Sequence, residues 1–336
     1  MILLKLAPIT SIAQAQAMLE TAINVEFGTL PPYLYAQLTI LPGSNGPAMA
    51  RLQSITHQEM IHLCLAANIL NALGGSPKLN PPTYPGPLPG DIGHDGKVLT
   101  LHILPFGKPA MQQGMNIEMP VDPIDFPQLK TLAAAPLVKA VTIGQFYEAL
   151  DAYLKTLPAT AWQAGRNQIA DKQFFPGQLF AVNNYADAHR AIQTIISEGE
   201  GSSTDPLDFG KELAHFYRFE EIYRNQVLTS SDSPQGFSWG GPLGVDYDKV
   251  FPAIADPQLH DFSKEPAAAR EAQDACTIAY SAMVDSLNLA LNGNAAQLGI
   301  AVRKMFDLRM AAIQALHAPL ADKHKVAGPA FIYKKI

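Results

Sequence analysis

The chain has 336 residues and a formal net charge of −6; nearly half of its residues are apolar and 16% are charged. This composition suits one or two globular domains with a sizeable core, and it excludes a disordered chain. The chain shows no basic cluster, no apolar run as long as a membrane span and no signal-peptide pattern, so we expect a cytoplasmic protein with neither a nucleic-acid nor a membrane partner.

The first predicted helix starts at a candidate capping box in residues 10–14, and its apolar face ends on Glu26. The two prolines at 31–32 predict a kink, after which the helix resumes. Tyr33 lies one step beyond Glu26 on the same face. It is a candidate proton or electron donor, with core packing as the alternative explanation.

The second predicted helix, residues 52–73, carries Glu59 and His62 in the middle of an otherwise apolar face. A buried carboxylate is costly unless it is paired or bound to a metal. The spacing Glu-x-x-His places both side chains one turn apart and pointing the same way. This spacing is typical of ferritin-like di-metal carboxylate bundles.

Residues 76–140 predict a long crossover, because prolines and glycines are dense in their first part and at most a short strand fits at 98–104. Parallel helices of a bundle need such a connection. A helix capped by Thr142 follows. In the loop-rich segment 158–184, we expect the aromatic pair 174–175 to cover a cleft that opens to the metal site; the alternative is that this segment caps helix ends.

A further helix is predicted to contain both Glu212 and His215, which repeat the spacing Glu-x-x-His. A neighbouring helix is predicted at 187–198. Glu198 is its last residue, and Glu200 follows two residues later. Two such pairs plus single inward carboxylates on other helices make up the ligand pattern of a di-metal bundle. The plain alternative is a set of amphipathic helices with buried Glu–His or Glu–Arg pairs.

The ligand from the third helix stays open between Glu148, Glu198 and Glu200. Glu148 lies off the apolar face of its helix, which favours a solvated position. Glu198 and Glu200 lie at a helix C-terminus, where an acid opposes the helix dipole.

After a polar linker at 230–244, two helices are predicted at about 266–291 and 295–317. We therefore expect residues 1–230 to form a bundle and residues 231–336 to form a helical extension packed on it. Cys64 and Cys276 are expected to be reduced core residues, in keeping with a cytoplasmic location.

Several segments along the chain resemble the ferritin-like domain of the iminophenyl-pyruvate dimer synthase family, and they occur in the order of that family. These segments are residues 26–34, 57–63, 142–147, 198–201, 215–219 and 327–331. The resemblance implies a ferritin-like four-helix bundle with a C-terminal helical extension, and metal ligands at Glu26, Glu59, His62, Glu200 and His215. Glu212 is added to this set by its spacing from His215.

The chain departs from the family pattern at two positions. Gln145 stands where an acid is expected, which argues against a required ligand there, and Glu198 stands where glutamine is more frequent. The pigment-pathway enzymes of that family are also much longer than this chain. The resemblance therefore supports the fold and the metal site more strongly than it supports their reaction.

Taken together, the sequence predicts a mainly α, ferritin-like bundle with a carboxylate-bridged pair of divalent metals. Carboxylate and imidazole ligands suit iron, with manganese and zinc as options. The expected function is an oxidoreductase that uses oxygen or peroxide on a small, amino-acid-derived molecule. The alternatives are iron oxidation and storage without an organic substrate, and a structural scaffold. The oligomeric state is left open, with a homodimer as one option.

Overall fold

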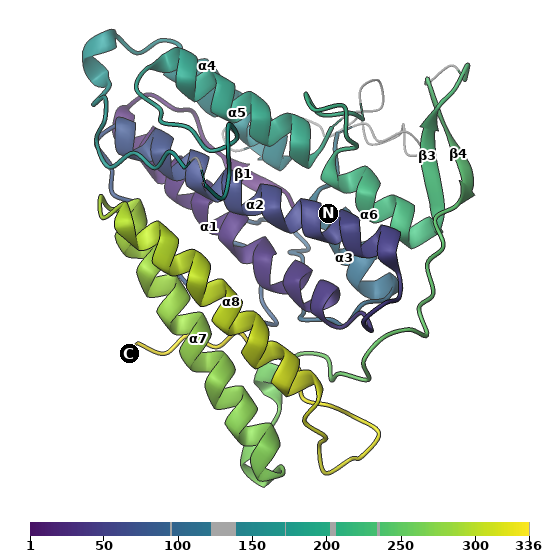
Figure 1. Cartoon of the computed structure of the whole chain (residues 1–336). Coiled ribbons are helices and arrows are strands. Elements are labelled where there is room, and N and C mark those ends of the chain that lie inside the picture. Colours follow the sequence, from purple (N-terminus) through teal and green to yellow (C-terminus); the bar gives the residue numbers. More distant parts are fainter. Residues whose placement is uncertain (95, 122–138, 172, 202–205, 234–235, 336) are drawn as a thin grey trace.

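Four helices form the bundle at the centre of the molecule (Figure 1), and they confirm the expected mainly α fold. They are α1 (Ile12–Leu38), α2 (Gly46–Ala72), α4 (Ile143–Leu154) and α5 (Tyr185–Gly199). Helix α1 contacts α2 and α4, and α5 contacts the same two helices, so the four form a closed ring. The computed structural model describes residues 1–94, 96–121, 139–171, 173–201, 206–233 and 236–335.

Helix α1 begins at Ser11, whose side chain accepts a hydrogen bond from the backbone of Gln14. The helix continues through Pro31 and Pro32, where the sequence predicted a kink. Proline at position 32 removes the donor that the carbonyl group of Gly28 would have had in a regular helix. The hydroxyl group of Tyr84 donates to that carbonyl oxygen at 2.6 Å, so the broken helical bond is replaced.

The crossover contains a helix that the sequence did not predict, α3 (Lys108–Ile117). The last part of the crossover lies outside the described residues. The strand predicted at 98–104 is wrong, because Leu101 makes only an isolated bridge to Gly86. The backbone N–H groups of the next two residues donate to the side chains of Gln113 and Asp256 instead of to a strand.

Helix α3 packs against α6 (His215–Arg224), and both lie at one end of the bundle, next to α1 and α2. The short strand β1 (Leu4–Leu6) pairs antiparallel with β2 (Lys139–Val141), which ties the N-terminus to the start of α4. The expected polar linker after α6 is wrong, because strands β3 (Gln226–Ser230) and β4 (Phe237–Pro242) form an antiparallel hairpin there.

The C-terminal part contains α7 (Ala267–Leu291) and α8 (Ala296–Leu316), close to the predicted bounds. These two helices pack on each other as a hairpin, and the hairpin lies against the side of α1 and α2 in Figure 1. Short 3₁₀ turns occupy Ala159–Ala161, Pro257–Leu259 and Phe262–Lys264. The division of the chain near residue 230 stays a prediction.

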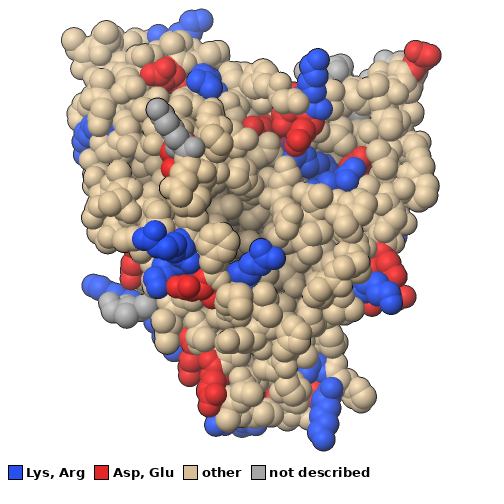
Figure 2. Space-filling view, in the orientation of Figure 1, with Lys and Arg blue, Asp and Glu red and all other residues tan. Residues whose placement is uncertain are grey.

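Charged side chains are sparse on the surface. On the face shown in Figure 2, Lys and Arg side chains stand singly or in small groups among Asp and Glu, and most of the surface is uncharged. Among the described residues, none of the helices combines the length and apolar character needed to cross a bilayer. Cys64 and Cys276 are both buried free thiols.

Candidate metal centre

Acidic and histidine side chains from four helices meet inside the bundle and form two groups that share Glu59. In the first group, ligand atoms of Glu26, Glu59 and His62 lie within 4.8 Å of one another. In the second group, the same holds for Glu59, Glu118 and His215. All five side chains are buried. A carboxylate shared between two groups of donors is the arrangement that bridges a pair of metal ions.

The two histidines approach Glu59 from different helices. Nδ1 of His215, at the start of α6, lies 2.9 Å from Oε1 of Glu59 and 3.9 Å from Oε2 of Glu118. Nδ1 of His62, on α2, lies 3.8 Å from Oε1 of Glu59 and 3.8 Å from Oε2 of Glu26. The two imidazole rings stack with their centroids 5.5 Å apart.

The hydrogen bonds of Gln58 determine which nitrogen of His215 is free. Oε1 of Gln58 accepts from the guanidinium group of Arg218 at 2.7 Å, so this atom is an acceptor. It lies 3.1 Å from Nε2 of His215, which therefore donates to it. In the neutral ring Nδ1 then carries a lone pair, and among the described residues it has no hydrogen-bond partner.

Three hydroxyl groups orient the carboxylates. Thr29 donates to Oε2 of Glu59 at 2.5 Å, and Tyr147 donates to Oε1 of Glu26 at 2.8 Å. Tyr33 donates to Oε1 of Glu118 at 2.6 Å. The candidate donor Tyr33 therefore contacts the cluster through a carboxylate that the sequence did not single out, and its role in catalysis stays a prediction.

The three acids considered for the third helix take different positions. Oε2 of Glu198 lies 2.8 Å from Nε2 of His62, so Glu198 fixes the ring nitrogen that faces away from Glu59. Glu200 lines the same small cavity as Glu26, Glu59, His62 and Glu118. Glu148 is exposed. The structure thus favours Glu200 as the further candidate ligand and Glu198 as the group that orients His62.

The carboxylate of Glu200 sits against the first turn of α4. It accepts hydrogen bonds from the hydroxyl group of Thr142 at 2.9 Å and from the backbone of Gly144 at 2.7 Å. A Cβ atom at position 144 would lie 2.6 Å from Oε2 of Glu200. Only glycine therefore leaves room for this carboxylate.

The prediction that Glu212 shares a helix with His215 is wrong, and the structure places Glu212 away from the cluster. Its side chain is 61% exposed and lies 3.2 Å from a guanidinium nitrogen of Arg218. Helix α6 begins only at His215. Upstream, the backbone of Asp208 donates to the carbonyl oxygen of Glu212, and this turn prevents the helix from extending backwards.

Burial raises the pKa of the clustered carboxyl groups, because the charged form loses its hydration. Burial, and then the charge of Glu59, raise the pKa of Glu26 to about 8. Burial raises the pKa of Glu200 to about 7, although the backbone of Gly144 opposes the shift. The pKa values of Glu59 and Glu118 are also raised by burial. Because four carboxyl groups pack closely here and, among the described residues, His62 is the one cationic group beside them, the cluster indicates a place for further cations.

The pKa values of the two histidines shift in opposite directions. Burial by itself would lower the pKa of His62, but the hydrogen bond and charge of Glu198 raise it to about 9. Burial, with the nearby charges of His62 and Arg218, holds the pKa of His215 well below its usual range. His215 is therefore the neutral imidazole that a metal needs.

The cavity at the cluster has a volume of about 10 Å³, which is close to the space that one water molecule requires. The expected cleft covered by the aromatic pair 174–175 is not found at this site. Phe175 instead contacts His57 and lines a larger cavity that none of the clustered acids and histidines lines. The loop-rich segment therefore covers a different face of α2.

The donor set fits a pair of divalent cations. Glu26, Glu59, Glu118 and Glu200 supply four carboxylates, and His62 and His215 supply two imidazoles. This oxygen and nitrogen set suits iron or manganese, and it contains no thiolate, since Cys64 lines the other cavity. The unpaired Nδ1 of His215 adds a lone pair that no described protein group uses.

A family model described as Ferritin-like matches residues 19–224, which is more than half of the chain. The chain belongs to the Ferritin-like family. The match includes every one of the clustered acids and histidines.

Two individual proteins are similar to this member of the family. A 2-imino-3-(indol-3-yl)propanoate dimerase of Chromobacterium violaceum is 26% identical over 295 residues, covering 76% of this chain. The chain spans only 26% of the length of that enzyme. The crystal structure of a ferritin-like protein from Caulobacter vibrioides matches with a TM-score of 0.65 and 20% identity, covering 97% of this chain and 100% of that one. The second likeness shows the fold.

Sequence reasoning missed Glu118. This residue lies at the C-terminal end of α3, in a segment expected to be a crossover without a helix. A signal was present, because Glu118 stands between Ile117 and Met119 and is the one acid in a run of apolar and amide side chains. An isolated acid in such a run is expected to be buried with a partner.

Proposed function

We propose that this protein is a di-metal carboxylate oxidoreductase, and that Glu59, which belongs to both groups of donors, would help to hold both metal ions. The observation that supports it best is the distance of 2.9 Å between Nδ1 of His215 and Oε1 of Glu59. Because Gln58 leaves Nδ1 without a proton, the lone pair of the ring faces the carboxyl group of Glu59 at hydrogen-bond distance, and once that group is ionised two electron-pair donors face each other. A cation between such donors removes the repulsion between them.

Iron is the metal we propose, with manganese and zinc as the competing occupants of the same ligands. When bound, a pair of iron ions supplies the capacity to react with oxygen or peroxide. The residues of the chain hold the two ions in place, neutralise their charge and exclude bulk water from a cavity of about 10 Å³. Tyr33, through its hydrogen bond to Glu118, is the proposed group that delivers or accepts a proton beside the metals.

A small, amino-acid-derived molecule is the proposed organic substrate. The support is the likeness to the dimerase of Chromobacterium violaceum, whose name states that it acts on 2-imino-3-(indol-3-yl)propanoate, a small imino acid. Because the chain spans only 26% of that enzyme, the substrate class and not the dimerisation is carried over. A substrate of this size does not fit in the cavity at the cluster, so it would react from outside that cavity.

Oxidation of iron without an organic substrate is a second candidate function. The small cavity favours it, because a space of about 10 Å³, close to that of one water molecule, does not admit an organic molecule. The acidic cluster supports both functions equally.

The two functions are separated by how many ferrous ions each chain oxidises. Metal-free protein is loaded anaerobically with increasing amounts of ferrous iron and then exposed to oxygen. An oxidoreductase with resident metals should stop after about one di-iron cycle until a substrate and a reductant are supplied. Oxidation and retention of tens of ferrous ions per chain would contradict the oxidoreductase and establish the second function. Absence of metal uptake after reconstitution would contradict both.

A further inference from the structure

A large cavity lies between the bundle and the C-terminal hairpin, with α1 and α2 on one side and α7 and α8 on the other. Its volume is about 410 Å³. Pockets that hold small organic ligands have volumes of roughly 300–1,000 Å³. The cavity is therefore large enough for a small molecule, in contrast to the space at the metal cluster.

This cavity is separate from the proposed metal centre. Glu26, Glu59 and His62 point from α1 and α2 toward the small cavity, while Phe27 and Met60 on the same helices line the large one. The two sites thus lie on different faces of the same helix pair. A ligand in the large cavity would contact neither the metals nor their ligands.

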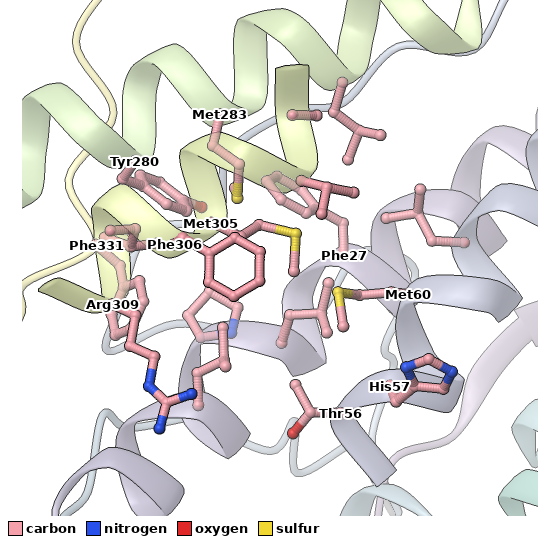
Figure 3. A pocket seen from close by; sticks show the side chains of 18 of the residues that line it. Phe27, Thr56, His57, Met60, Tyr280, Met283, Met305, Phe306, Arg309 and Phe331 are labelled. Atoms are coloured by element: carbon pink, nitrogen blue, oxygen red, sulfur yellow. The ribbon is translucent and has the colours of Figure 1, made fainter. Parts of the chain in front are cut away.

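The interior of the cavity is apolar and adaptable. Figure 3 shows Met60, Met283 and Met305 converging on its centre from α2, α7 and α8, beside the rings of Phe27 and Phe306. Methionine side chains are flexible and polarisable, and they fill irregular gaps around bound apolar groups. Phe306 is 61% exposed, so it stands at the mouth. These walls fit the apolar body of a ligand.

The polar groups on the walls are few. Arg309 is the one Lys or Arg side chain that lines the cavity, and Figure 3 shows its guanidinium group at the margin. Among the described residues no Asp or Glu lines the cavity. Deeper inside, the buried hydroxyl group of Tyr280 has no hydrogen-bond partner among the described residues.

We propose that this cavity binds a small carboxylic acid with an apolar body. The body lies among Met60, Met283 and Met305, and the carboxylate stays at the mouth beside Arg309. A cation at the edge of an apolar space favours an anionic head group over a neutral or cationic one. This site is independent of the proposed oxidoreductase function, since it uses no residue of the metal centre.

The test compares three compounds that share one body and differ in the charge of the head group. Octanoate, 1-octanol and octylammonium are titrated into metal-free protein by isothermal calorimetry. Octanoate should bind once per chain and roughly tenfold more tightly than 1-octanol, with octylammonium weakest. Equal affinity for the three compounds, or no binding of octanoate, would overturn the proposal.

Two variants locate the binding. Arg309→Met should reduce the affinity for octanoate to that for 1-octanol, and because Arg309 is exposed this change should not affect folding. The matched control is Arg303→Met, an exposed arginine on α8 that does not line the cavity. If both variants lost affinity equally, the effect would come from net charge and the site would be wrongly placed.

The metal-loaded protein provides the last control. A carboxylate can also bind to a metal ion, so octanoate is titrated into protein with and without bound metal. The proposal requires the same affinity in both forms. Binding that occurred only in the metal-loaded form would place octanoate at the metal centre and overturn the proposal. The outcome of this test leaves the proposed oxidoreductase function untouched.

Discussion

Oε1 of Gln58 lies 3.1 Å from Nε2 of His215 and accepts a hydrogen bond from this protonated ring nitrogen. The same oxygen accepts from Arg218, so the amide cannot turn around without placing its NH₂ group against a guanidinium. Gln58 thereby determines which nitrogen of His215 faces Glu59. Groups of this kind, which touch a ligand and not the metal, typically contribute a factor of about 10–100 in metal affinity.

We predict that Gln58→Leu weakens metal binding by about 10- to 100-fold while the protein stays folded. The physical reason is that His215 loses the acceptor that keeps its Nδ1 unprotonated. The measurement is a competition titration of ferrous iron against a chelator of known affinity. Gln53→Leu, on the same helix but exposed, is the control. Equal affinity of both variants would show that the Gln58 hydrogen bond does not position the ligand.

Glu118→Gln should remove metal from the second group of donors, whereas Glu212→Gln should leave metal content unchanged. Glu118 is buried beside His215, and Glu212 is 61% exposed. Metal content per chain, measured by elemental analysis after reconstitution, checks both variants. Loss of metal in Glu212→Gln together with full occupancy in Glu118→Gln would restore the ligand set that the spacing predicted.

Gly144→Ala should act on the metal centre without changing any ligand. The added Cβ would lie 2.6 Å from Oε2 of Glu200 and force that carboxylate to move. If Glu200 is a ligand, metal affinity should fall by roughly tenfold. Gly46→Ala, at a glycine with no neighbouring atom within 4 Å of an added Cβ, is the control. Unchanged affinity in Gly144→Ala would remove Glu200 from the ligand set.

The metal-free protein should lose stability as the pH rises above neutrality. The pKa of Glu26 is raised from 4.5 to about 8, so the folded form holds a proton that the unfolded form releases. This stabilisation is complete below the unfolded pKa and is lost as the pH rises through about 8. The raised pKa of His62, about 9, acts in the same direction. His215, with a lowered pKa, contributes no further change above about pH 7.

Between about pH 7 and 8.5 we expect the free energy of unfolding to fall by about 3 kcal/mol in metal-free protein, with Glu26 and His62 each contributing about 1–2 kcal/mol. Denaturant titrations at several pH values measure it. Bound metal should abolish the fall, because the cations replace the protons, and it should raise the melting temperature. Glu26→Gln should make this fall smaller, and the part that comes from His62 should remain. A stability that rises over this range would contradict the raised pKa values.

Tyr33→Phe should keep both metals and slow the reaction of the reduced protein with oxygen by roughly 100-fold, the lower end of the usual effect of a proton-transferring group. The hydroxyl group of Tyr33 is held 2.6 Å from a carboxylate of the cluster. Stopped-flow absorbance after mixing with oxygen gives the rate. Tyr35→Phe is the control, because Tyr35 donates to the carbonyl oxygen of Ile254 outside the cluster. Equal rates in both variants would leave Tyr33 as a packing residue.

The sequence by itself determined the residues that a single helix carries on one face. The steps of three and four residues that bring Glu59 and His62 together, and that set Glu26 on the inner side of α1, follow from the 3.6-residue period. Burial of a carboxylate on an apolar face then required a partner, and this argument was enough to predict a metal site in a ferritin-like bundle.

Only the tertiary structure decided which side chains from different elements meet. Glu118 reaches the cluster because α3 packs against α6 at the end of the bundle, and no local period marks that approach. Glu212 is excluded because the turn it forms with Asp208 delays the start of α6 to His215. Spacing in sequence predicts neighbours only while the backbone stays helical; across a turn or between helices, packing and hydrogen bonds choose the neighbours.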